Sequence, residues 1–438
     1  MTVLKSVATA LTFALMLTRV AAGAEAAAPA LPEPDGPYAV GMQRFELTDP
    51  SRHGVVSRDP NEPRVLPGYV WYPAKHGTRG TRPYFTPAEV ETQAHAMARN
   101  FGYGADELNG FDKVITHSVE AAPPARGTAF PILIFNHGYE CYPAQNTALL
   151  ERLASHGYIV LSIGHPHDAA DMRLANGTLL ATLHPAGNDP EFAALRKTLM
   201  SAPSHAARTA ALTGYDAAFN RDRLGASLVA WRDDTVFTAR AIQEGQMPPS
   251  LKPVFAMGDT HRLGFIGMSF GGATAVSTCK LVAECRVVVN LDGGNYDASL
   301  FNAPVERPLL LLMSDWVNLP LPNRPSDPAF NGSDYAYEPW SRAGLNPNVV
   351  RLRVEGIRHM GFTDLILLMN GPAHEERFGT VQQGVAVAAI GNASLAFLDQ
   401  HLKNGDRKAL DKVIARTPVL KLHSPTSVRQ WAAGAFPD

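Results

Sequence analysis

Residues 265–275 read Phe-Ile-Gly-Met-Ser-Phe-Gly-Gly-Ala-Thr-Ala, a G-x-S-x-G pattern centred on Ser269. Gly makes up 36 of the 438 residues, so the pattern alone could also mark an ordinary glycine-rich turn. The context favours another structure, because an apolar run precedes the serine and small residues follow it. A nucleophile elbow needs this layout, since side chains at the flanking positions would collide with the neighbouring strand and helix. The stretch therefore predicts a serine held at a sharp turn from a buried strand into a helix.

Apolar runs and helical patterns alternate on both sides of this turn. The predicted strands are Pro67–Tyr72, Val114–Val119, Pro131–Phe135, Tyr158–Ile163, Arg262–Gly267, Arg286–Leu291, Pro308–Met313 and Val349–Val354. The predicted helices are Ala144–His156, Ser227–Glu244, Phe270–Ala283 and Val381–Lys403. Continuous Val/Ile/Leu runs are typical of strands buried on both faces, so the order predicts an α/β fold with a mostly parallel sheet covered by helices. The stretch before residue 125 is expected to add antiparallel edge strands.

Residues 165–225 differ from the rest, because they are rich in Ala, His and Asp and contain short amphipathic runs such as Phe192–Leu199. They lie between two predicted strands and are expected to form a cap-like insertion over the face that carries Ser269. Residues 25–438 are then a single domain that includes this insertion. Leu195 and Leu199 could give the cap an apolar surface, but such a stripe usually packs onto its own domain. We therefore expect at most weak contact with a membrane surface.

The charge balance excludes one class of partner. The chain carries 39 Lys and Arg against 41 Asp and Glu, a formal net charge of −2, and no basic block stands out. Nucleic-acid binding is therefore not expected. The sequence leaves the oligomeric state open.

The amino terminus has the layout of a signal peptide. Lys5 precedes the apolar run Val7–Leu17, and Ala22-Gly23-Ala24 offers a cleavage site. The run is short for a membrane span, and Arg19 interrupts it. Residues 1–24 are therefore predicted to be removed, and the mature protein is predicted to be secreted or periplasmic.

Three cysteines leave at least one unpaired in an exported monomer. Cys279 and Cys285 lie close together, at the predicted end of the helix after Ser269 and the start of the next strand. An oxidising compartment permits a disulfide between them, but only the geometry decides whether it forms. Cys141 is expected to be a buried small apolar side chain, since Ser269 is the better placed nucleophile.

A serine nucleophile needs a base, an acid that orients the base, and an oxyanion hole. In α/β-hydrolases the acid and then the histidine follow the serine in the chain, each on a loop after a strand. The histidines after Ser269 are His359, His374, His401 and His423. His359 follows the predicted strand Val349–Val354 by a short loop, so it is predicted to be the base. The other three are expected to be surface histidines.

Two carboxylates are candidates for the acid. Asp292 follows the predicted strand Arg286–Leu291 and precedes two glycines. Asp315 follows the next strand, the position where many α/β-hydrolases carry the acid. The residue pattern alone leaves both candidates open.

The oxyanion hole is expected to use two backbone N–H groups. One belongs to Phe270, directly after the serine. The other belongs to Tyr139, in the loop Asn136-His137-Gly138-Tyr139 that follows the strand Pro131–Phe135. His137 is expected to hold this loop by hydrogen bonds rather than to transfer protons.

A series of further blocks extends over residues 36–364. The blocks are Gly36-Pro-Tyr-Ala-Val-Gly41, Val70-Trp-Tyr-Pro73, Ile134-Phe-Asn-His-Gly138, Leu153-Ala-Ser-His-Gly-Tyr-Ile-Val160, Gly267-Met-Ser-Phe-Gly-Gly-Ala-Thr274, Leu291-Asp292 and His359-Met-Gly-Phe-Thr-Asp364. In this order they resemble the secreted and type II platelet-activating factor acetylhydrolases. The glycine-rich blocks occur in many hydrolases, whereas the first and the last are more specific.

This resemblance implies an α/β-hydrolase fold and a carboxylic ester hydrolase that needs no cofactor. In that family the acid follows the strand after the nucleophile helix, so the resemblance favours Asp292 over Asp315. The substrate does not follow from the resemblance. Our first expectation is a small-molecule or lipid ester with a short or oxidised acyl chain, the sn-2 ester of a phospholipid being one candidate.

The segment Gly164-His-Pro-His-Asp168 departs from the family, which usually carries a charged Glu-His-Arg-Asp type ending there. Together with the long insertion it could shape a different pocket, so a general carboxylesterase or polyesterase is an alternative. His165, His167 and Asp168 could suggest a metal site, but no spacing for a third ligand supports one, and no metal is expected. A non-catalytic binding protein on the same fold is the alternative from another class, and it would require a broken triad.

Overall fold

The computed structural model describes residues 29–126, 129–184, 190–301, 303–319, 334–338 and 346–435. Its main strands are β1 (Ala39–His53), β2 (Pro63–Ala74), β5 (Ser118–Glu120), β6 (Phe130–Asn136), β7 (Ile159–Ile163), β10 (Gly258–Met268), β11 (Cys285–Leu291), β12 (Leu309–Met313), β13 (Val349–Val354) and β14 (Leu420–Leu422). Two short pairs are β3 (Arg82–Pro83) with β4 (Ile115–Thr116), and β8 (Met172–Arg173) with β9 (Leu179–Leu180).

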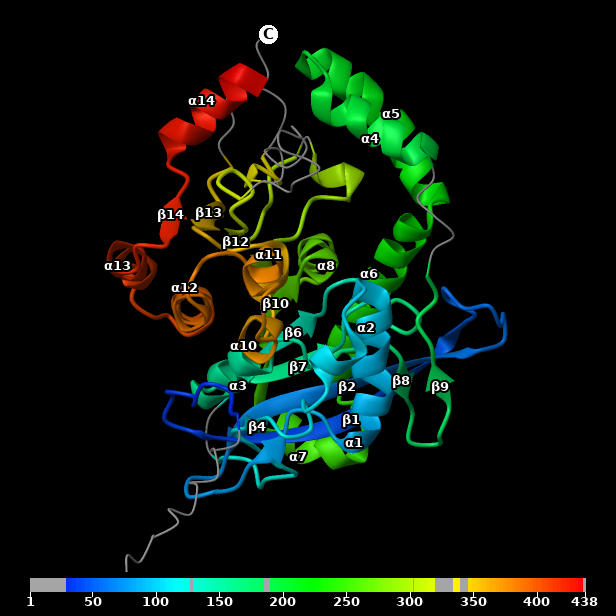
Figure 1. The fold of residues 1–438 in the computed structure, drawn as a ribbon, viewed down its shortest axis with the longest axis vertical. Coiled ribbons are helices and arrows are strands. Elements are labelled where there is room, and N and C mark those ends of the chain that lie inside the picture. Colours follow the sequence, from blue (N-terminus) through cyan, green and yellow to red (C-terminus); the bar gives the residue numbers. More distant parts are fainter. Residues whose placement is uncertain are drawn as a thin grey trace, which may run out of the picture.

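The main strands form one ten-stranded sheet in the order β14-β13-β12-β11-β10-β6-β7-β2-β1-β5 (Figure 1). The block from β13 to β7 is parallel throughout. At its ends β14 and β2 pair antiparallel, and β1 pairs antiparallel with β2. The predicted α/β class with a mostly parallel sheet is therefore confirmed.

Helices cover both faces of this sheet (Figure 1). The α-helices are α1 (Pro87–Glu89), α2 (His95–Phe101), α3 (Thr147–Ser155), α4 (Pro190–Ser201), α5 (His205–Arg221), α6 (Arg223–Gln243), α7 (Lys252–Phe255), α8 (Phe270–Cys279), α10 (Leu365–Leu368), α11 (His374–Phe378), α12 (Gln383–Leu402), α13 (Ala409–Arg416) and α14 (Pro425–Ala435). A π-turn spans Val90–Ala94, and 3₁₀ turns span Ala105–Leu108, Pro249–Leu251, Ala298–Leu300 and His359–Phe362. Side chains of α3 and α12 belong to the core on one face, and those of α6 and α8 to the core on the other.

Strand β10 illustrates why the central strands are apolar throughout. Its residues Leu263 and Phe265 lie in the core with α6 and α8, whereas Ile266 and Met268 lie in the opposite core with α3 and α12. All four are fully buried. A strand with helices on both faces has no solvent-facing side, so it shows no alternation of polar and apolar residues. The elbow serine follows the carboxyl end of this strand.

The structure differs from the predicted elements in two segments, Val114–Val119 and Ala144–His156. The predicted strand Val114–Val119 divides into β4 and β5, and between them the N–H of His117 donates to the Glu151 carboxylate. The segment β5 pairs parallel with β1, so the edge predicted before residue 125 is not entirely antiparallel. The predicted helix Ala144–His156 begins only at Thr147, because the preceding residues form turns beside the elbow.

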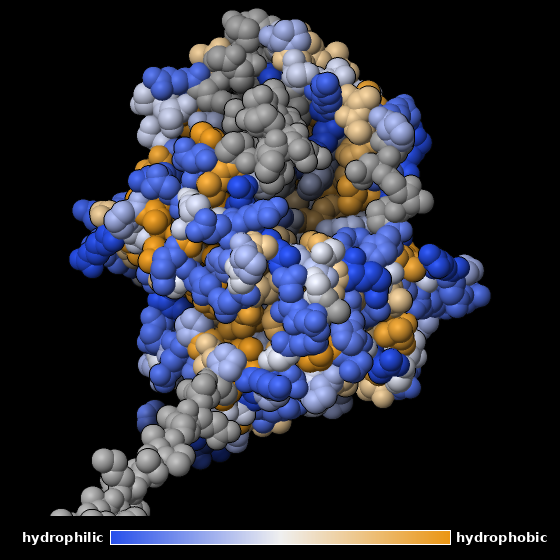
Figure 2. Space-filling view, in the orientation of Figure 1, coloured by the Kyte–Doolittle hydropathy of each residue, from blue (hydrophilic) through white to orange (hydrophobic). Residues whose placement is uncertain are grey.

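The insertion at residues 165–225 contributes β8, β9 and the helices α4 and α5 (Figure 1). Aromatic side chains of the two helices pack in one cluster with Trp231 of α6 and Phe270 of α8. Leu199 is buried in this cluster and Leu195 packs against it, as expected for a stripe that faces its own domain. Figure 2 shows a hollow beside the α4–α5 pair with apolar side chains along it.

Cys279 and Cys285 form a disulfide that joins the end of α8 to the start of β11. Cys141 is free and buried, and burial raises the pKa of its thiol far above the usual range. This agrees with an inert apolar side chain. Within the described ranges, none of the helices has the length and apolar character needed to cross a bilayer. The predicted leader, residues 1–24, lies outside the described residues.

Candidate active site

Ser269 stands between β10 and α8 in a backbone conformation that non-glycine residues rarely adopt, with φ 56° and ψ −123°. A Cβ at Gly267 would lie 2.1 Å from the carbonyl oxygen of Gly271. A Cβ at Gly271 would lie 2.2 Å from the carbonyl oxygen of Asn136. Only glycine fits at either place, so the strand and the helix can approach closely and hold the serine in a strained turn. The predicted elbow geometry is present.

His359 lies within hydrogen-bond distance of both Ser269 and Asp292. It opens the 3₁₀ turn after β13, and its side chain is 32% exposed. Its Nε2 is 2.8 Å from the Ser269 Oγ, and its Nδ1 is 2.6 Å from Asp292 Oδ2. An ionised carboxylate only accepts hydrogen bonds, so the imidazole proton resides on Nδ1 and Nε2 offers its lone pair to the serine hydroxyl. The arrangement can therefore remove the proton from Ser269.

The Asp292 carboxylate is fixed by the backbone around it. Asp292 adopts φ 58°, and its N–H donates to the Leu312 carbonyl at 2.7 Å. Its Oδ1 accepts the Ser314 N–H at 2.7 Å, which leaves Oδ2 for the imidazole. The Asn290 side chain holds the following turn, because its amide bonds both the N–H and the carbonyl of Gly293.

The competing candidate, Asp315, has a different position. One carboxylate oxygen accepts the Gly356 N–H at 2.8 Å, and its own N–H donates to the Ile357 carbonyl at 2.8 Å. Asn318 donates to the same carboxylate at 2.9 Å. Asp315 therefore secures the turn before His359 and does not reach the imidazole. Of the two carboxylates that the residue pattern left open, the structure brings Asp292 to the histidine.

The loop after β6 presents the N–H of Tyr139 without a protein acceptor in the described part of the chain. Its neighbours are all occupied: Gly138 donates to Gln145 Oε1 at 2.8 Å, Glu140 to the Asp168 carbonyl at 2.7 Å, and Cys141 to the Gly138 carbonyl at 3.0 Å. Among the described residues, the N–H of Tyr139, which was predicted to be an oxyanion donor, is therefore free to bind a substrate oxygen.

Phe270 supplies the second predicted donor. It is the first residue of α8, where a helix leaves its N–H groups without intrahelical acceptors. The preceding N–H, that of Ser269, donates to the Leu291 carbonyl at 2.8 Å, and the Phe270 N–H has no acceptor among the described residues. Both predicted oxyanion donors are therefore available beside the serine.

His137 contributes structure to this loop. Its Nδ1 lies 2.7 Å from the Gly138 carbonyl, and its Nε2 accepts the His165 N–H at 3.1 Å. Complete burial, and next the proximity of His165, lower the pKa of His137 to about 3. The ring therefore stays neutral near neutral pH, and its two nitrogens are used in holding the loop.

His165, His167 and Asp168, the three residues after β7 that could have suggested a metal site, each have a separate partner. His165 Nδ1 bonds Asp234 at 2.8 Å, and His167 Nε2 lies 2.7 Å from Glu62. Asp168 accepts from Trp231 at 2.9 Å. The described residues contain no group of three or more metal-binding side chains.

The remaining histidines after the serine lie away from the triad. His374 Nε2 is 3.0 Å from the Ile366 carbonyl, and His401 packs edge-on against Phe397. Burial, followed by the nearby arginines, lowers the pKa of His423 to about 4. All three are partly buried, so the expectation of surface histidines was too simple.

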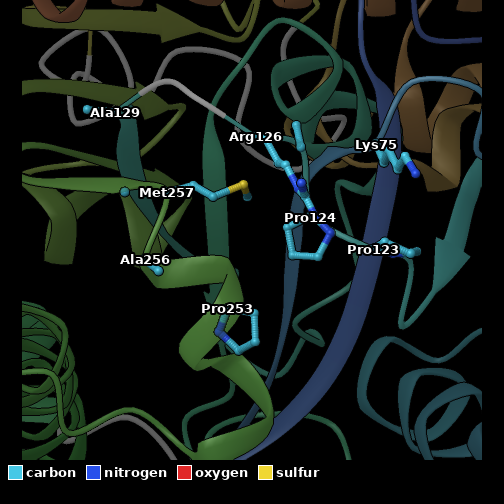
Figure 3. A pocket seen from close by; sticks show the side chains of 10 residues that line it. Lys75, Pro123, Pro124, Arg126, Ala129, Pro253, Ala256 and Met257 are labelled. Atoms are coloured by element: carbon cyan, nitrogen blue, oxygen red, sulfur yellow. The ribbon is translucent and has the colours of Figure 1, made fainter.

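A crevice of about 660 Å³ lies near the amino ends of two central strands (Figure 3). Its walls include Lys75, Arg126 and Met257, next to the amino ends of β6 and β10. Ser269 follows the carboxyl end of β10. The crevice therefore lies at the amino ends of the parallel strands, whereas the triad lies at their carboxyl ends.

The sequence pattern did not predict several residues whose hydrogen bonds hold the loops of the site together. Asn146 donates to the Phe362 carbonyl at 2.6 Å, and the Asp364 N–H donates to the Gln145 carbonyl at 2.8 Å. These bonds fasten the histidine loop to the oxyanion loop. Asp364 lies in the ending block His-x-x-Phe-x-Asp, so its presence there was a signal. Gln145 and Asn146 gave none, because they follow no strand and match no motif.

Comparisons with known proteins give consistent results. Residues 109–166, which include β6 and the Tyr139 loop, match the model of the Chlorophyllase family. The chain is 24% identical over 275 residues to a protein of Arthroderma benhamiae named Probable 1-alkyl-2-acetylglycerophosphocholine esterase. That match covers 60% of this chain and 59% of the relative's length. The resemblance predicted from the sequence blocks is thereby confirmed.

A solved structure has the same fold. The ferulic acid esterase from Streptomyces cinnamoneus superposes with a TM-score of 0.65 at 23% sequence identity. The match covers 91% of this chain and all of the other. The chain therefore has the α/β-hydrolase fold. Across 60% of its length, its sequence is similar to that of a protein named Probable 1-alkyl-2-acetylglycerophosphocholine esterase.

Proposed function

We propose that this protein is a serine hydrolase of carboxylic esters. The observation that carries the proposal is the pair of hydrogen bonds made by His359, to Ser269 at 2.8 Å and to Asp292 at 2.6 Å, at a strained elbow. The N–H groups of Tyr139 and Phe270, which have no acceptor among the described residues, lie on the adjoining segments. A nucleophile, a base with its orienting acid, and two donors are the parts that acyl transfer requires.

The reaction follows from these roles. Ser269 Oγ attacks the ester carbonyl carbon while its proton passes to His359 Nε2, and the carbonyl electrons move onto the oxygen held by the two N–H groups. Asp292 stabilises the imidazolium. When the tetrahedral intermediate collapses, the alcohol leaves with the proton from Nε2, and the acyl group stays on Ser269. Water then gives a proton to Nε2, attacks the acyl-enzyme and releases the acid, and the proton returns to Oγ.

The proposed substrates are short-acyl esters, with sn-2 acetyl phospholipids as one candidate. The relative from Arthroderma benhamiae supports this choice by its name. The rings of Tyr139 and Tyr296, each centred 5.5 Å from that of Phe270, are partly exposed beside the nucleophile and favour an apolar substrate group. A general carboxylesterase or polyesterase would use the same chemistry. Any contact with a membrane surface is proposed to be weak.

Export is a further part of the proposal. The predicted signal peptide, residues 1–24, motivates it, and the Cys279–Cys285 disulfide is compatible with an oxidising compartment. Mass spectrometry of the protein from its native host tests this. A mature chain that begins near residue 25, found outside the cytoplasm, is expected, and an intact leader on a cytoplasmic protein would contradict it.

Ser269→Ala tests the reaction. The variant should fold as the wild type does, lose several orders of magnitude of turnover on p-nitrophenyl butyrate, and lack the burst of p-nitrophenol. A fluorophosphonate should add one phosphonyl group to the wild type at Ser269 and none to the variant. A variant with full activity would refute the proposal.

Substrate preference requires a second measurement. The values of kcat/KM for p-nitrophenyl acetate, p-nitrophenyl octanoate and an sn-2 acetyl phosphatidylcholine below its aggregation threshold should be compared. A clear preference for the acetyl esters, phospholipid included, is expected. Similar values across acyl lengths and no phospholipid turnover would support a general carboxylesterase instead.

A further inference from the structure

Trp231 of α6 contacts the segments that carry the two oxyanion donors. Its indole, which is fully buried, meets the Phe270 ring edge-on with the ring centroids 5.0 Å apart. The Tyr139 ring lies nearly parallel to it at 6.2 Å. The His137 ring, from the loop that presents Tyr139, packs at 4.8 Å. One side chain thus contacts both donor residues, which lie in segments more than a hundred residues apart in the chain.

The indole is itself held in one orientation. Its Nε1 donates to Asp168 Oδ2 at 2.9 Å, and the other oxygen of this buried carboxylate accepts from Arg223 at 2.7 Å. The His165 imidazole stacks on the indole with centroids 3.9 Å apart and 10° between the planes. The hydrogen bond to Asp168 at its edge and the His165 ring on its face therefore restrict rotation of the Trp231 indole.

The His165 ring is fixed in turn by buried charges. Its Nδ1 lies 2.8 Å from Asp234 Oδ2, and Arg64 grips the same carboxylate through two bonds of 2.5 and 3.0 Å. Burial alone would raise the pKa of Asp234, but Arg64 and the His165 hydrogen bond outweigh it and hold the pKa below its usual range. Burial also lowers the pKa of His165, so the imidazole is neutral and donates from Nδ1.

The Asn136 amide completes the network beneath the oxyanion loop. Its Oδ1 lies 2.9 Å from His165 Nε2 and accepts from the Thr235 hydroxyl at 2.9 Å. The same Thr235 hydroxyl also lies 2.8 Å from the Trp231 carbonyl. Asn136 thus connects the strand before the oxyanion loop to His165 and to α6. Every ring beneath the loop has a fixed orientation.

We propose that Trp231 is a positioning residue that sets the places of the Tyr139 and Phe270 N–H groups for the developing oxyanion. The inference rests on the proposed function. Trp231 is fully buried and so acts through its two neighbours rather than on the substrate. A small displacement of donors preorganised for the transition state is costly, whereas binding of the ground state hardly depends on them.

Two variants test the proposal: Trp231→Phe, which keeps a ring but loses the bond to Asp168, and Trp231→Leu, which removes the ring. Trp71→Phe on β2 is the matched control, because Trp71 is equally buried but belongs to the core with α3 and α12. With p-nitrophenyl butyrate, kcat should fall about 10-fold in Trp231→Phe and about 100-fold in Trp231→Leu, while KM changes less than about 3-fold.

A readout specific to the oxyanion separates positioning from general stability. An alkyl trifluoromethyl ketone adds to the serine and forms a tetrahedral oxyanion, so its inhibition constant should rise in parallel with the loss of kcat. Butyrate, a ground-state ligand, should inhibit all variants alike. Trp71→Phe should lower the melting temperature as much as Trp231→Phe but leave kcat within about 2-fold.

The outcomes are distinguishable. Folded Trp231 variants with unchanged kcat and ketone affinity would overturn the inference and leave the esterase proposal intact. An equal loss of kcat in Trp71→Phe would also overturn it, because the effect would then be general. A wild-type protein that neither hydrolyses esters nor binds the ketone would refute the proposed function itself.

Discussion

Replacing Asp292 with Asn changes the chemistry of the acid but keeps its shape. In the wild type, Ser314 N–H donates to one oxygen at 2.7 Å and His359 Nδ1 to the other at 2.6 Å. The Ser314 N–H still needs an oxygen in the variant, so the new NH₂ group must face the imidazole. It donates to Nδ1 and forces the ring proton onto Nε2. The histidine then cannot accept the proton of Ser269.

The expected loss in kcat is about 10⁴-fold, the cost of the wrong tautomer in a comparable triad, or about 5 kcal/mol at 1.36 kcal/mol per decade. Steady-state kinetics with p-nitrophenyl butyrate measure it, and a melting curve checks that the variant folds. Asp315→Asn is the matched control. It keeps an oxygen for the Gly356 N–H, so its loss should be less than about tenfold. A greater loss in Asp315→Asn than in Asp292→Asn would refute this reasoning.

Three further results are expected. Burial lowers the pKa of His137 to about 3, from about 6.5 in an unfolded chain, so acid favours unfolding between these two pH values. The unfolding free energy from urea titrations should fall between pH 6 and pH 4 about 1 kcal/mol per pH unit more steeply than in His137→Gln, and equal slopes would contradict the assignment. Replacing Cys279 and Cys285 together by Ser should cost about 2 kcal/mol of stability for so short a loop, with thermal melts under reducing and oxidising conditions as the check. Because Leu199 is buried and Leu195 packs on the cap cluster, activity should not jump at the substrate's aggregation threshold; a jump with vesicle co-sedimentation, abolished by joint change of both to Asp, would indicate an interfacial enzyme.

Much of the site could be predicted because its parts follow strands. Ser269 and His359 were assigned from local context and chain order, since each follows a strand that the apolar pattern marks. Tyr139 and Phe270 followed from the same rule. The choice between Asp292 and Asp315 stayed open on the residue pattern, because the carboxyl ends of adjacent parallel strands reach the same edge of the sheet. The family resemblance then favoured the acid that the structure places at the imidazole.

The support beneath the site could not be predicted in this way. Asp234 and Arg64 are 170 residues apart in the chain and touch only because α6 packs beside the hairpin of β1 and β2. Trp231 sits in a helix whose pattern indicates burial but not which rings it will meet. Such contacts depend on how elements dock, and sequence separation carries no information about docking. The disulfide was undecided for the same reason, since its two cysteines are near in sequence but their orientation depends on where α8 ends.

The sequence by itself thus determined the elbow, the parallel sheet, and Ser269 and His359 as two residues that follow the carboxyl ends of its strands. These features are local: glycines without side chains allow one sharp turn, and apolar runs without alternation allow only a strand covered on both faces. The tertiary structure alone decided which carboxylate reaches the imidazole and which side chains hold the oxyanion loop. Those distances depend on the twist of the sheet and on the packing of α6, which arise from the whole core acting together.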